Sequence, residues 1–110
     1  MGGNGANQLG VAMAGLMQRF RPLLEERIAL LESTATAAAG GTLTAEKLAE
    51  GYGAAHKLAG VLGTFGLQEG TVLAREAETI CSGKHPPDTA ESLRIQAIAA
   101  QLRVMLAESN

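Results

Sequence analysis

The sequence predicts an all-α fold, an antiparallel up-down four-helix bundle with a short extra N-terminal helix. The 110 residues include 20 Ala and 15 Leu, which favour helices. They include only eight Val and Ile, two Phe, one Tyr and no Trp, the residue types on which strands depend. A hydrophobic fraction of 46% and a net charge of −2 are typical of one folded domain. The 14 glycines do not fit a plain helical composition and need a separate explanation.

The chain is expected to form one domain over residues 7–110, after a flexible leader at residues 1–6. The apolar run from Leu9 to Met17 is too short to span a bilayer. The single Cys81 cannot form an internal disulfide, which favours a reducing compartment. We therefore expect a cytoplasmic protein that does not contact a membrane. The chain has nine Lys and Arg against 11 Asp and Glu, so it lacks the excess of positive charge that is typical of nucleic-acid-binding proteins.

The first two helices are predicted at residues 7–19 and 22–39. Arg21 precedes Pro22, and a residue before proline is pushed out of the α region, so a boundary is expected there. Pro22 suits the first turn of the second helix because its missing N–H would have no helical partner. Gly40 and Gly41 are expected to end that helix.

A third helix is predicted at residues 45–65, with Thr42 or Thr44 as its cap, and Gly66 closes it. Its core stripe, read at four- and three-residue spacing, is Leu48, Tyr52, Ala55, Ala59, Leu62 and Gly66. A short link through Leu67 leads to a fourth helix at residues 68–82.

The last helix is expected to follow a break at Gly83 and the segment Lys84-His85-Pro86-Pro87. Asp88 with Glu91 three residues on is a capping box, and the helix runs to Ala107. Its apolar stripe consists of Ile95, Ile98, Leu102 and Met105 or Leu106.

His56 lies one position off the predicted core stripe and is surrounded by glycines. Gly53, Gly60 and Gly63 lie three residues before it and four and seven after it, on the same helix face. Each glycine inside a helix costs about 1 kcal/mol relative to Ala. Two interpretations are open: Gly60 and Gly63 let a neighbouring helix pack closely, or another protein reaches the imidazole across bare backbone.

A partner for the imidazole is expected on the fourth helix. His56 lies eleven residues before Leu67 and Glu78 eleven after it, so a hairpin about Leu67 places them side by side. A carboxylate beside one ring nitrogen would fix the tautomer and leave the other nitrogen as a nucleophile. Arg75 would supply a cation near an anionic adduct. The alternative is that Glu78 and Arg75 belong to a solvated face.

The stretch from Ala55 to Gly66 resembles the signature of histidine-containing phosphotransfer (HPt) domains. That signature has a His, a Gly four residues later, another Gly ten residues later and then a Leu-rich helix ending near a Glu, and His56, Gly60, Gly66 and Glu78 fit it. The family's fold, a four-helix bundle with a short helix, agrees with the predicted helices.

The resemblance implies that His56 accepts a phosphoryl group from a receiver-domain aspartate or a histidine kinase and passes it to another receiver. It implies a phosphorelay intermediate without kinase activity of its own. It also implies that the chain binds no cofactor, because the partner receiver supplies Mg²⁺. The bare surface of Gly53, Gly60, Gly63 and Thr64 would then dock that partner. Glu78, Arg75 and Lys57 are the residues expected to support the His or its phosphate.

The sequence departs from the family at two positions of the signature. The Lys that usually lies three residues after the His is replaced by Ala59, and the small polar residue that is common after the first Gly is replaced by Val61. Lys57, one residue after His56, lies about 100° round the helix from it. The alternative function is therefore a non-catalytic interaction or dimerisation domain, including a degenerate phosphotransfer domain. A metal site is not expected, because the spacing of His56, Cys81 and His85 in the sequence matches no recognisable pattern of metal ligands. Cys81 is expected to be a small core residue and His85 a solvated turn residue.

Overall fold

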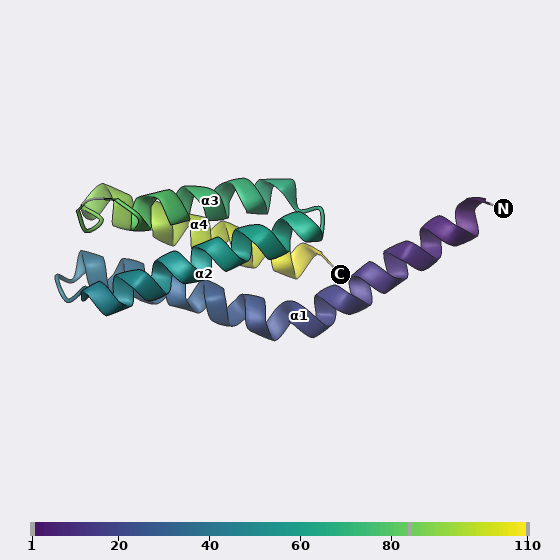
Figure 1. Cartoon of the computed structure of the whole chain (residues 1–110), viewed down its shortest axis with the longest axis horizontal. Helices are drawn as coiled ribbons and strands as arrows, with labels where there is room; N and C mark the ends of the chain where they lie inside the picture. The colour runs from purple at the N-terminus through teal and green to yellow at the C-terminus, as the bar shows by residue number, and fades with distance from the viewer. Residues whose placement is uncertain (1, 84, 110) are drawn as a thin grey trace.

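The computed structural model describes residues 2–83 and 85–109, and side chains from residue 10 onward. Its helices are α1 (Gly2–Ala39), α2 (Ala45–Thr64), α3 (Gln68–Cys81) and α4 (Thr89–Glu108), and no strand occurs in these residues. α1 packs against α2 and α4, and α3 packs against the same two helices, which closes a four-helix bundle (Figure 1). The predicted all-α bundle is confirmed.

The helix ends follow the local sequence. Gly41 and Gly66 adopt φ of 74° and 75°, a backbone conformation that favours glycine at the end of a helix. Thr44, rather than Thr42, caps α2 by accepting a hydrogen bond from the backbone N–H of Lys47 at 3.1 Å. The capping box is present, since the Asp88 carboxylate accepts from the Glu91 N–H and the Glu91 carboxylate from the Asp88 N–H.

The predicted break before Pro22 is wrong. Pro22 lies inside α1, so the described residues contain no separate short N-terminal helix. Met17 and Leu24 lie two turns apart on opposite sides of Pro22, and both are buried in the same core. This packing keeps the helix continuous across a residue that lacks one backbone hydrogen bond. The N-terminal part of α1 extends beyond the other three helices (Figure 1). The division into a leader and a domain from residue 7 stays a prediction.

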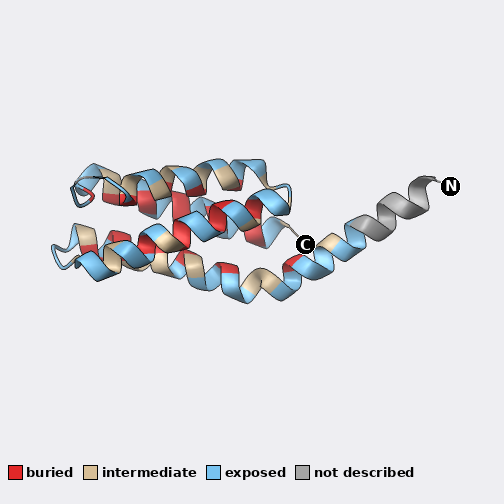
Figure 2. Cartoon of the chain, in the orientation of Figure 1, coloured by how far each residue is buried: buried red, intermediate tan, exposed pale blue. Residues whose placement is uncertain are grey.

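The core lies along the common axis of the bundle (Figure 2). Each helix except the alanine-lined α3 contributes large side chains that are fully buried: Leu24, Ile28, Leu31, Leu58, Leu62, Ile95, Ile98 and Leu102. The stripe predicted for α4 is confirmed, with Leu106 buried and Met105 partly buried. Hydrophobic burial of this kind is the main source of stability in a small bundle.

The stripe predicted for α2 needs correction. Leu58, which we did not include, is fully buried, whereas Tyr52 is 39% exposed and Gly66 is exposed. The face of α2 that meets the bundle consists of Gly51, Ala54, Ala55, Leu58, Ala59 and Leu62. Tyr52 lies outside this buried face. Its side chain is therefore partly exposed, on the same side of α2 as His56.

Candidate functional site

His56 is exposed on the outer face of α2. Its side chain is 64% accessible to solvent, while its neighbours Ala54, Ala55 and Leu58 are buried. A helix that buries these positions turns position 56 outward, because successive residues are about 100° apart. The imidazole is therefore open to a partner and fixed at its base to a well-packed helix.

The contact predicted between His56 and Glu78 is present. Nδ1 of His56 lies 2.9 Å from Oε2 of Glu78 on α3, and the Glu78 side chain is only 18% exposed. A carboxylate accepts and does not donate, so Nδ1 carries the hydrogen and donates it. In the neutral ring Nε2 then has a free lone pair. The arrangement provides a nucleophilic nitrogen directed away from α3.

The aromatic ring of Tyr52 lies near the imidazole and almost parallel to it. The ring centroids of Tyr52 and His56 are 6.3 Å apart and the ring planes differ by 12°, a stacked arrangement. We had predicted Tyr52 to be a core residue and so missed this contact. The signal in the sequence was the four-residue spacing, which places two side chains on one helix face.

Two of the three glycines around His56 border open space. A Cβ atom added at Gly53 or Gly60 would have nothing within 4 Å, so close helix packing does not explain them. A Cβ at Gly63 would lie 3.3 Å from Oγ1 of Thr71 on α3, so packing accounts for this one. The Thr64 hydroxyl is exposed and donates to the carbonyl of Gly60 at 3.1 Å.

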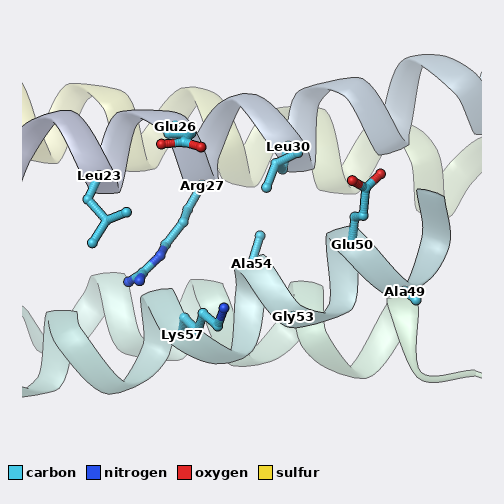
Figure 3. Close-up of a pocket in the computed structure, with 9 residues that line it drawn as sticks. All are labelled: Leu23, Glu26, Arg27, Leu30, Ala49, Glu50, Gly53, Ala54 and Lys57. Carbon is cyan, nitrogen blue, oxygen red and sulfur yellow. The ribbon is translucent and has the colours of Figure 1, made fainter. Parts of the chain in front are cut away.

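The cationic side chains near the site lie on two different sides of it. Arg75 is 63% exposed on α3, with Nη1 4.0 Å from Oε1 of Glu78. Lys57 lines a groove of about 350 Å³ between α1 and α2, together with Arg27 and Gly53 (Figure 3). Ala59 is buried, and its carbonyl accepts a hydrogen bond from the Thr71 hydroxyl at 3.3 Å.

The remaining candidate ligands do not assemble into a site. Among the described residues no group of three or more His, Cys, Asp or Glu side chains could hold a metal ion. Cys81 lies in the hydrophobic core as predicted, and burial raises the pKa of its thiol to about 11. His85 is exposed, and its Nδ1 lies 2.9 Å from the carbonyl of Pro86. This contact and the nearby Glu91 raise the pKa of the His85 imidazole.

None of the helices described here has a stretch both long and apolar enough to cross a membrane. A family model described as "Hpt domain" matches residues 15–109. No curated protein and no solved structure matches the chain.

Proposed function

The chain belongs to the histidine-containing phosphotransfer domain family, and from this premise we propose that His56 carries the phosphoryl group in a two-component phosphorelay. Domains of this family are phosphotransfer intermediates rather than kinases, and they work with response regulators and histidine kinases. In this proposal His56 accepts the group from a receiver aspartate or a histidine kinase and donates it to a receiver aspartate. The observation that carries it is an exposed imidazole whose Nδ1 is held by Glu78.

The chemistry requires one bond to form and one to break. The Nε2 lone pair of His56 attacks phosphorus as the bond from phosphorus to the aspartate oxygen breaks, which returns a free carboxylate to the receiver. The hydrogen on Nδ1 stays in place, so the phosphorylated ring is an imidazolium. The Glu78 carboxylate, 2.9 Å from Nδ1, stabilises this positive charge. Transfer in the other direction reverses these steps.

The docking surface proposed for the receiver consists of Gly53, Gly60, Gly63 and Thr64 around His56. Phosphoryl transfer depends mainly on alignment of the attacking and leaving atoms and on neutralisation of charge. The open space beside Gly53 and Gly60 lets a partner approach the imidazole without displacing side chains. The receiver would bring the aspartate and its Mg²⁺, and the chain itself is proposed to need no cofactor.

Arg75 and Lys57 are proposed to support the phosphate, with Arg75 the stronger candidate. Its guanidinium lies beside the carboxylate that holds His56, and its side chain is mostly exposed. Lys57 lines the groove shared with α1, on the other side of the site, which makes it the weaker candidate (Figure 3). Buried Ala59 replaces the usual Lys, so the charge near the phosphate differs from the family pattern.

We further propose a cytoplasmic location, no kinase activity of its own, and no binding to nucleic acid or membranes. The absent Lys at position 59 favours a second candidate function. In that alternative the bundle is an interaction or dimerisation domain whose His56 no longer transfers phosphate.

Labelling by a phosphorylated receiver tests the proposal. Incubation should give the wild-type chain an acid-labile, alkali-stable phosphate, and His56→Gln should abolish it. His85→Gln is the matched control, because His85 is also exposed but lies in the α3–α4 connection. Labelling that survives in His56→Gln contradicts the proposed site. No labelling by any receiver of the same organism supports the non-catalytic alternative.

Substitution of the bare surface tests docking separately. Gly60→Leu should block transfer from the receiver while circular dichroism shows an intact bundle, because the added side chain enters open space. Loss of helicity in this variant would instead assign Gly60 to packing.

A further inference from the structure

Tyr52 lies one helical turn before His56, and Gly60 lies one turn after it. The Tyr52 ring therefore lies on one side of the imidazole, while position 60, on the other side, carries no side chain. Tyr52 is one of three aromatic residues in the chain, and the other two, Phe20 and Phe65, pack edge to face with each other. The remaining aromatic ring is thus placed at the proposed site, half-exposed, rather than in the core.

The contact with Glu78 restrains the imidazole at one atom. The ring is joined to α2 by the rotatable Cα–Cβ and Cβ–Cγ bonds, and the single hydrogen bond at Nδ1 limits rotation about them without stopping it. Such rotation moves Nε2, the attacking atom. A second ring nearly parallel to the imidazole, with its centroid 6.3 Å away, limits the space for this rotation on one side.

We infer that Tyr52 is a positioning residue: its ring holds the plane of the His56 imidazole so that Nε2 points across Gly60 toward the incoming phosphoryl group. The inference rests on the proposed function. It adds a residue that acts through His56 and touches neither the phosphate nor the partner's aspartate. Misalignment of an attacking atom slows transfer, so the rate depends on this support.

The alternative role for Tyr52 is only to shield apolar side chains of the bundle from solvent. Its side chain also lines a shallow groove of about 380 Å³ between α2 and the end of α3, beside Leu48 and Cys81. A residue that only covered this groove would be replaceable by an aliphatic side chain of similar size. Stacking requires an aromatic ring, and the hydroxyl is dispensable for it. The variants Tyr52→Phe and Tyr52→Leu therefore separate the two roles.

The test measures phosphorylation of the full chain by phosphoramidate, which transfers its phosphoryl group to Nε2 and releases ammonia. Tyr52→Ala and Tyr52→Leu should lower the rate about 2- to 10-fold, the range that corresponds to the strength of an aromatic pair. Tyr52→Phe should retain the wild-type rate. Leu93→Ala, which removes another exposed apolar side chain, on α4, is the control and should have no effect.

A nuclear magnetic resonance spectrum of the imidazole gives a second readout. The resonances of the His56 ring protons should shift in Tyr52→Ala and Tyr52→Leu, because the ring current of Tyr52 is lost, and stay in place in Tyr52→Phe. A wild-type rate in Tyr52→Leu would overturn the positioning role even if the resonances shift. A wild-type chain that takes no phosphoryl group from either phosphoramidate or a receiver would overturn the proposed function itself.

Discussion

Single glycine residues in α2 have two opposite roles. A Cβ at Gly51 would lie 2.5 Å from Oγ1 and 3.0 Å from Cγ2 of Thr34, a fully buried side chain on α1. Gly51 thus lets α1 and α2 approach each other. Gly60 has nothing within 4 Å and leaves room outside the bundle. A glycine costs about 1 kcal/mol of helix propensity relative to Ala at both positions. Only at Gly51 is this cost offset, because the missing side chain allows close packing between α1 and α2.

Alanine substitution should therefore have opposite effects at these two glycines. Gly51→Ala should lower the free energy of unfolding by about 1–3 kcal/mol, because the short Thr34 side chain must move in a full core. Gly60→Ala should raise it by up to about 1 kcal/mol through helix propensity alone. Urea unfolding followed by circular dichroism measures both. Equal effects of the two substitutions would contradict the distinction between a packing glycine and a bare one.

At the level of the helical elements, α1 is the helix whose limits depend most on tertiary packing. A proline fits the first turn of a helix without cost, but in the interior it costs about 3 kcal/mol relative to Ala. Local sequence around Pro22 permits both arrangements. Burial of Met17 on one side and Leu24 on the other selects the continuous helix.

Pro22→Ala should consequently stabilise the protein, by up to about 3 kcal/mol, because it restores an interior backbone hydrogen bond in α1. The side chain is exposed, so little packing is lost. The midpoint of thermal unfolding measures the effect. If α1 were instead two helices with Pro22 in the first turn of the second, the same substitution would leave stability unchanged or reduce it.

Across the whole molecule, exposed ion pairs join α4 to both of its neighbours. Arg103 on α4 donates from Nε and Nη2 to the two carboxylate oxygens of Glu32 on α1, at 2.8 and 2.7 Å. Arg94 on α4 binds Glu76 on α3 in the same bidentate manner. The pairs link α4 to α1 and α3, while the apolar stripe supplies most of the stability.

The Glu32–Arg103 pair should make a small, pH-dependent contribution to stability. The hydrogen bonds from Arg103 lower the pKa of the Glu32 carboxyl from its ordinary value. Its contribution is therefore fully present above the unfolded pKa and is lost as the pH falls through the lower folded value. A double-mutant cycle with Glu32→Gln and Arg103→Gln at pH 7 should give a coupling below about 1 kcal/mol, because both side chains are exposed. The coupling should fall in acid and in high salt, and a coupling unchanged at pH 3 would contradict this assignment.

Much of this architecture was predictable because local signals determined it. Thr44, Gly66 and the Asp88–Glu91 box set the ends of α2 and the start of α4. The His56–Glu78 contact followed from a short link between two straight helices. The exposure of Tyr52 did not follow, because its position lies at the edge of the apolar face and a small rotation of α2 decides its burial. The packing role of Gly51 also depended on Thr34, a residue of another helix.

The central claim is that His56 both accepts and returns a phosphoryl group. It is tested most directly by a chase: the chain is labelled from a phosphorylated receiver, purified, and mixed with unphosphorylated receiver and Mg²⁺. We predict that the label leaves the chain and appears on the receiver aspartate, and that His56→Gln never acquires it. Label that forms on the wild-type chain at a residue other than His56, or that stays on His56 in the presence of every receiver, would contradict the claim.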